Sequence, residues 1–159
     1  MSKKAHLKYL NEAVNQAEIA VNNGDEPFGT VLVLDNKIVF KGHNEVSGGD
    51  HTRHPEFEAA RWAASNLTLE ERKRAVVYTS GEHCPMCSAA HAWVGLGDIH
   101  YASSSKQLVS WYNEFEQKLS NVKPLSILEV VKDIKVYGPY KEFSDRIKKL
   151  HEISISNNN

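Results

Sequence analysis

The stretch SGEHCPMCSAAHAW, residues 80–93, contains both cysteines of the chain, Cys84 and Cys87. It follows the β-rich run AVVYTS, and its helical pattern ends at Gly95, so the two thiols lie where a strand passes into a helix. The free N–H groups and the dipole at the start of a helix stabilise thiolates. Cysteines at positions i and i+3 of such a junction are typical of a metal site or a redox pair.

A second chemical motif, HPE at residues 54–56, begins another predicted helix. Pro55 suits the first helical turn, where its missing N–H costs nothing. In a sheet that is covered by helices, ligands bind beyond the carboxyl ends of the strands, where the next helices begin. We therefore expect the two motifs to meet. The helical face behind the second motif is formed by Phe57, Ala60, Ala64 and Leu67.

The remaining patterns predict an α/β fold. The run FGTVLVLDNKIVFKG reads as two antiparallel strands joined at a turn, Asp35-Asn36. Further strands are expected at 98–103 and 127–136, and further helices at 7–21, 105–119 and 138–153. This order predicts a mixed sheet with helices on both faces. Residues 1–153 are expected to form one domain, followed by a frayed polar tail, 154–159.

The composition of the chain argues against nucleic-acid and membrane partners. The chain has 159 residues, a formal net charge of −1 and a pI of about 6.7. Nucleic-acid and membrane partners usually select an excess of Lys and Arg, and no segment has the roughly 20 consecutive apolar residues that span a bilayer. We expect a cytoplasmic protein with a small neutral substrate, no membrane partner and no nucleic acid.

The two motifs together predict an open zinc site. Cys84, Cys87 and His54 supply three protein ligands, whereas a structural zinc ion normally has four. The open position leaves room for a water molecule that zinc activates near neutral pH. Glu56 lies two residues beyond His54, where a carboxylate can move protons without binding the metal.

The combination H-x-E followed by C-x-x-C resembles the cytidine-deaminase-like superfamily of zinc-dependent nucleobase and nucleoside deaminases. The resemblance runs from Glu26 to Ala102 and includes HPEFEAAR and YTSGEHCPMCSAAHAW. It implies a three-layer α/β/α fold with a five-stranded mixed sheet, one Zn²⁺ per chain, and hydrolysis of a C–N bond of a cyclic amidine. It also implies a homodimer or a higher homo-oligomer.

The resemblance extends to substrate-binding residues. It implies that Asn44 holds the base and that Phe28 lines its pocket. His83 stands where the family usually has proline and is expected beside the metal, while Trp93 is expected either in the pocket wall or in the core. The triplet PFG, residues 27–29, is nearest the guanine deaminase branch. We therefore expect guanine or a related aminopurine as the substrate.

Other functions stay open at this stage. A tRNA adenosine-to-inosine deaminase or a cytosine or cytidine deaminase would use the same zinc chemistry. A thioredoxin-like dithiol oxidoreductase would use the two cysteines alone. A non-catalytic RNA-binding module would need free cations, and Arg146, Lys148 and Lys149 are interpreted instead as a solvated helix face.

Overall fold

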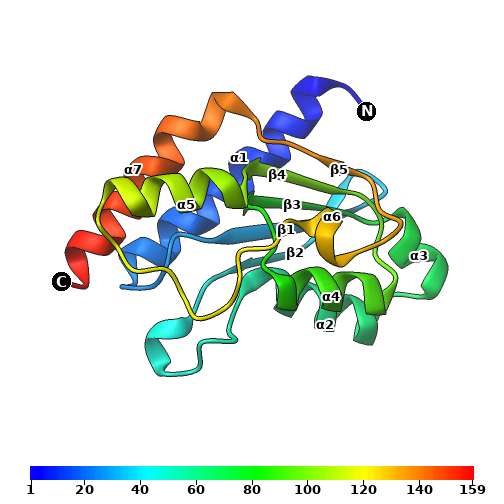
Figure 1. The fold of residues 1–159 in the computed structure, drawn as a ribbon. Coiled ribbons are helices and arrows are strands. Elements are labelled where there is room, and N and C mark those ends of the chain that lie inside the picture. Colours follow the sequence, from blue (N-terminus) through cyan, green and yellow to red (C-terminus); the bar gives the residue numbers. More distant parts are fainter.

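A five-stranded mixed sheet forms the middle layer of the computed structural model, which describes residues 1–159 (Figure 1). The strand order is β2-β1-β3-β4-β5. Strand β1 is antiparallel to both of its neighbours, and β3, β4 and β5 are parallel. The strands are β1 (Gly29–Leu34), β2 (Lys37–His43), β3 (Val76–Gly81), β4 (Ile99–Ser103) and β5 (Val136–Tyr137).

Helices cover both faces of this sheet. They are α1 (Lys3–Asn22), α2 (Pro55–Asn66), α3 (Leu69–Arg74), α4 (Pro85–Val94), α5 (Ser105–Glu114), α6 (Ile127–Val130) and α7 (Ser144–Asn157). One apolar core joins α1, α5 and α7 to the sheet, and a second joins α2, α4 and α6 to the opposite face. The three-layer α/β/α architecture expected from the sequence is therefore confirmed.

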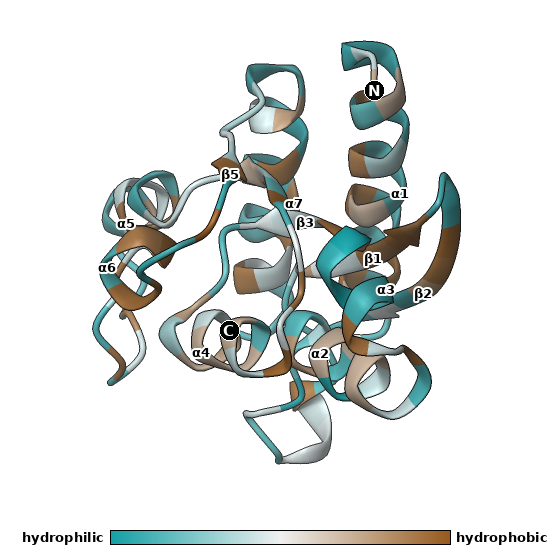
Figure 2. Ribbon diagram, turned by 90° about the vertical axis from the view of Figure 1, so that its right-hand side faces the viewer, coloured by the Kyte–Doolittle hydropathy of each residue, from teal (hydrophilic) through white to brown (hydrophobic).

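Side chains alternate along β1 between the two cores. Val31 and Val33 pack on the α1 side and Leu32 packs on the α2 side, as the period of two in a strand requires. This strand is apolar on both faces, and Figure 2 shows its hydrophobic colouring together with the mixed colouring of the helices. The predicted turn at Asp35 and Asn36 is present, with φ angles of 49° and 65° that match a type I′ hairpin.

Gly29 allows α1 to lie directly against the start of β1. A Cβ atom at this position would come 2.1 Å from the carbonyl oxygen of Ala13. Only glycine permits this close approach of helix and strand. The beginning of β1 is therefore held firmly, and the segment before it leads into the candidate site.

Part of the C-terminal prediction is wrong. The run 127–136 was expected to be a strand, but only Val136–Tyr137 pairs with β4. Ser126 and Glu129 form a capping box that begins the short helix α6 instead. A capping box between Thr68 and Glu71 likewise begins α3, which the sequence patterns did not predict.

The ends of two late helices also differ from expectation. The predicted helix 105–119 ends at Glu114. The predicted polar tail instead continues α7 to Asn157, and Ser154 is buried. Its hydroxyl donates a hydrogen bond to the carbonyl oxygen of Asp25 at 3.3 Å, so contact with the segment between α1 and β1 stabilises this last turn. None of the helices combines the length and the apolar character that crossing a membrane needs.

Candidate active site

The two chemical motifs meet at one edge of the sheet. Strand β3 ends at Gly81, and its antiparallel neighbour β1 begins there, because Thr30 pairs with Thr79. Cys84 is the N-cap of α4 and His54 is the N-cap of α2, and each helix has proline as its first residue. The prediction that both helices begin at the same edge is confirmed.

His54, Cys84 and Cys87 form a cluster with the geometry of a zinc site. The Nδ1 atom of His54 lies 3.5 Å from Sγ of Cys84 and 3.6 Å from Sγ of Cys87, and the two Sγ atoms are 3.5 Å apart. A tetrahedral zinc ion with Zn–N of about 2.05 Å and Zn–S of about 2.3 Å requires edges of about 3.6 Å and about 3.8 Å. The cluster therefore fits zinc. Both cysteines are free thiols, and their Sγ atoms lie 3.5 Å apart rather than at the about 2.05 Å of a disulfide bond.

The three side chains of this cluster shift one another's pKa values through hydrogen bonds. Hydrogen bonding to Cys87 is the main cause that lowers the pKa of Cys84 to about 4, and the pKa of Cys87 is raised well above its usual value. Hydrogen bonding to Cys84 raises the pKa of His54 to about 9. A metal ion binds neutral imidazole and thiolates, so its entry releases the protons that these groups share.

Glu56 is buried behind the metal cluster and belongs to α2. Its Oε1 atom accepts a hydrogen bond of 2.9 Å from the hydroxyl of Thr79, and Sγ of Cys87 lies 3.7 Å from its Oε2 atom. Burial raises the pKa of Glu56 to about 7. A carboxyl group with such a pKa can both accept and return a proton at neutral pH.

Asn44 follows β2 and is almost fully buried. Its Oδ1 atom accepts hydrogen bonds from the backbone N–H groups of Glu26, at 3.3 Å, and Val46, at 3.1 Å. Asn44 therefore stabilises the turn that follows β2. The role of Asn44 in holding the base stays a prediction.

Phe28 packs against an aromatic wall that the sequence patterns did not predict. Its ring makes an edge-on contact with His151 of α7, with ring centroids 5.3 Å apart. A Cβ atom at Gly81 would lie only 3.1 Å from this ring. Tyr112 of α5 also contacts His151, and its hydroxyl lies 3.4 Å from Nδ1 of that residue. Burial lowers the pKa of His151 to about 3, so the imidazole is neutral.

His83 is buried away from solvent. Its ring packs edge-on against His91 of α4 with centroids 5.5 Å apart, and neither ring nitrogen has a hydrogen-bond partner. The exposed fraction of His83 is 1%. The side chain of His83 is therefore part of the packing of α4, and its expected role beside the metal stays a prediction.

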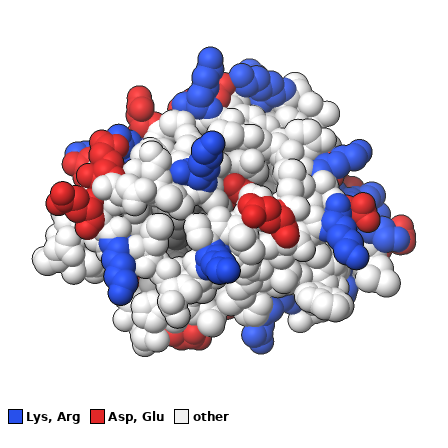
Figure 3. Space-filling model, viewed as in Figure 1, with Lys and Arg blue, Asp and Glu red and all other residues white.

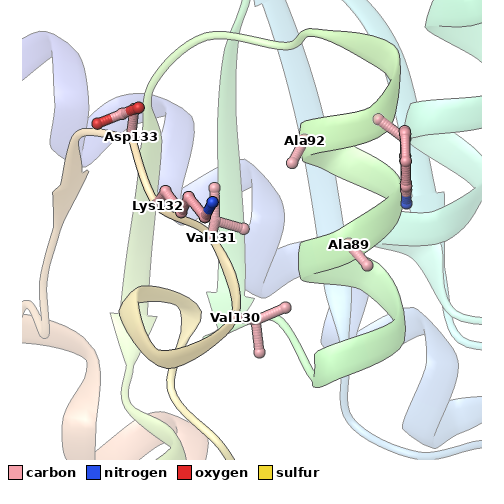
Figure 4. Close-up of a pocket in the computed structure, with 7 residues that line it drawn as sticks. Ala89, Ala92, Val130, Val131, Lys132 and Asp133 are labelled. Carbon is pink, nitrogen blue, oxygen red and sulfur yellow. The ribbon is translucent and has the colours of Figure 1, made fainter.

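Trp93 is placed in neither of the two expected surroundings. The side chain is 88% exposed, on the last turn of α4. It borders a surface groove with Ala89, Ala92, Val130 and Val131, and Figure 4 shows the α4 alanines opposite the two valines. The prediction that Trp93 lines the zinc pocket is wrong, because it extends into solvent from the opposite end of the helix that carries Cys87.

Comparisons with known proteins agree with this geometry. A family model described as the cytidine and deoxycytidylate deaminase zinc-binding region matches residues 3–103. That is more than half of the chain, and it contains His54, Cys84, Cys87 and Glu56.

Curated relatives carry the names of three different substrates. A probable cytosine deaminase of Schizosaccharomyces pombe is 32% identical over 143 residues, which are 86% of this chain and 85% of that protein. Guanine deaminase of Bacillus subtilis is 38% identical over 100 residues, 62% of this chain and 64% of that protein. A tRNA-specific adenosine deaminase 2 of Xenopus tropicalis is 35% identical over 89 residues, 52% of each chain. The latter two matches span less than two thirds of the relatives' length.

Solved structures share the fold. The X-ray structure of the Bacillus subtilis guanine deaminase has a TM-score of 0.58 at 29% identity and covers 79% of this chain and 83% of that chain. A structure in complex with 2,6-diaminopurine has a TM-score of 0.70 at 18% identity and covers 95% of this chain and 82% of that chain. The second likeness bears on the fold alone.

Proposed function

This chain belongs to the cytidine and deoxycytidylate deaminase family of zinc-binding hydrolases, and from this premise we propose that it removes the amino group of a free nucleobase, with guanine or a related aminopurine as the leading substrate. The family acts on C–N bonds by adding water and releasing ammonia. The observation that carries the proposal is the position of Glu56, a buried carboxyl with a near-neutral pKa beside a three-ligand cluster.

The roles of the residues follow from their contacts. His54, Cys84 and Cys87 would hold the zinc ion, which acts as a Lewis acid when bound. Glu56 takes a proton from the attacking water and passes it to the ring nitrogen; it then takes the second proton, from the hydroxyl group that the water has added to the ring carbon, and gives it to the departing amine. Thr79 holds the carboxyl group of Glu56 in place through its hydrogen bond.

The charge distribution favours a free base over RNA. On α7, Arg146 pairs with Glu18 at 2.9 Å and Lys148 pairs with Glu114 at 2.8 Å. Positive and negative side chains are interspersed over the face in Figure 3 and form no continuous basic patch. Binding to phosphates needs several free cations, and these two already have acidic partners. This supports a small neutral substrate.

The two base candidates have different support. Guanine is favoured by the triplet Pro27-Phe28-Gly29 and by the 38% identity to guanine deaminase in the zinc-binding part. Cytosine is favoured by the length of the cytosine deaminase match, because 86% of the chain cannot fit within residues 1–103. That match therefore extends into the C-terminal part, which forms the wall around Phe28. Cytosine is our second candidate.

Ammonia release from a panel of substrates tests the proposal. The panel contains guanine, cytosine, adenine, their ribonucleosides and a short tRNA anticodon hairpin. We expect turnover of a free base, guanine first, and loss of that turnover in Glu56→Ala while zinc stays bound. Glu58→Ala on the same helix removes an acid that pairs with Arg53 and is the matched control. Turnover of the hairpin alone, or retained turnover in Glu56→Ala, would contradict the proposal.

A further inference from the structure

Glu26 lies at the same sheet edge as the metal cluster, in the short segment between α1 and β1. Its backbone is fixed on both sides. The N–H of Glu26 donates to Oδ1 of Asn44 at 3.3 Å, and its carbonyl oxygen accepts a hydrogen bond of 2.8 Å from the N–H of Phe28. Before it, the Asp25 carboxylate accepts a hydrogen bond from Ser47 at 2.8 Å. Glu26 is therefore held in one position relative to Asn44 and Phe28.

The side chain of Glu26 has no hydrogen-bond or ion-pair partner, although it is partly buried. The surrounding acids do have partners: Glu45 pairs with Arg53 at 2.7 Å, and Glu82 accepts backbone hydrogen bonds from Ser105 and Ile127 at 3.0 and 2.9 Å. A half-buried carboxyl without a donor is costly and is retained mainly at functional sites.

Charged groups of both signs act on the carboxyl of Glu26, among them the metal ligand His54. Burial raises the pKa of Glu26, the charges of His54 and His51 oppose this rise and the charge of Asp25 adds to it; the charge of Glu26 in turn acts on the hydroxyl of Tyr112. Glu26 is therefore within electrostatic range of both the metal ligand His54 and Tyr112 of α5. An unpaired acceptor close to a metal ligand is available to a substrate of the zinc site.

We propose that Glu26 is a specificity residue whose carboxylate accepts a hydrogen bond from a donor group of the substrate. This inference rests on the proposed deamination of a base. The donor is a ring N–H in a free base and a sugar hydroxyl in a nucleoside, and both offer the same chemistry to a carboxylate. Asn44 holds the backbone of Glu26, so we infer that Asn44 positions the carboxylate of Glu26 at the substrate.

Matched substrates with and without the donor test this role. For free bases, guanine is compared with 9-methylguanine and cytosine with 1-methylcytosine. For nucleosides, guanosine is compared with 2′,3′-dideoxyguanosine. We expect wild type to favour the member with the donor in one of the two sets, as measured by kcat/KM. In Glu26→Gln and Glu26→Ala this preference should fall by about 10-fold or more, as expected for loss of a charged hydrogen bond.

Glu45→Gln is the control, because it removes a nearby negative charge that already pairs with Arg53. Zinc content and the thermal midpoint are measured for every variant. An unchanged preference in Glu26→Gln, or an equal loss for both members of each pair, overturns the role of Glu26 while leaving the deaminase intact. A wild type that releases no ammonia from any of these substrates overturns the proposed function and this inference together.

Discussion

The hydroxyl of Thr79 gives the sharpest test of how Glu56 works. Thr79 is fully buried on β3, and its closest hydrogen-bond acceptor is Oε1 of Glu56 at 2.9 Å. Thr79→Val keeps the shape of the side chain and removes this donor. A hydrogen bond to a charged group is worth about 1.5–3 kcal/mol, which corresponds to about 10- to 150-fold in rate if the bond persists in the transition state. We expect kcat to fall by that factor.

The Michaelis constant should change little in this variant, because Thr79 lies behind Glu56 and is closed off from the substrate. The assay is steady-state ammonia release with the best base of the panel, together with zinc analysis. Thr79→Ser retains the hydroxyl and should restore most of the activity.

Thr30→Val is the matched structural control. The hydroxyl of Thr30 donates to that of Thr79 at 3.1 Å across the β1 and β3 strands, so this variant loses a buried hydrogen bond but keeps the one to Glu56. Both valine variants should lose about 1 kcal/mol of stability. A kcat of Thr79→Val within about 3-fold of wild type, or an equal fall in Thr30→Val, would refute the reasoning.

Three further perturbations follow from other contacts. Cys84→Ala should lower zinc content from about one ion per chain to near zero, since two ligands bind zinc weakly; metal analysis that still finds full occupancy contradicts the assignment. Arg72→Ala should lower the free energy of unfolding in urea by about 2 kcal/mol, because the guanidinium binds carbonyl oxygens of Ala64, Leu67 and Val94; Arg72→Lys should recover only part of the loss. Burial lowers the pKa of His100 to about 4, so its contribution to stability is present above pH 6.5 and is lost as the pH falls towards 4. His100→Phe should weaken the pH dependence of the thermal midpoint between pH 6.5 and 4. An unchanged slope of thermal midpoint against pH would contradict this role of His100.

The zinc-binding half of the site could be predicted from the sequence because each part of it is local. His54 and Glu56 lie within one helical turn, and Cys84 and Cys87 begin another. Strand–helix junctions of this kind converge at the edge where the strands end, so two short motifs were enough to place the four groups together.

The aromatic contact between Phe28 and α7 could not be predicted in the same way. Phe28 and His151 touch although they are far apart in the chain, and nothing in the local pattern of either residue signals the contact. The run 127–136 is apolar enough for a strand, but the capping box at Ser126 and Glu129 begins a helix there. The prediction for Trp93 was wrong for another reason. Helical spacing identifies the residues that share a face of α4, but it does not say whether another element covers that face.

The family model matches the zinc site but not α7, the helix that contacts Phe28. The match to the family model ends at residue 103, after the zinc ligands and Glu56 but before the aromatic wall formed by α5 and α7. Relatives that share the matched part carry cytosine, guanine and tRNA adenosine in their names. The last helix reaches back to the segment that holds Glu26 and Phe28, through the Ser154 bond to Asp25 and the His151 contact. The zinc ligands and Glu56 therefore lie in the part that the family model matches, and the Phe28–His151 contact joins that part to the last helix.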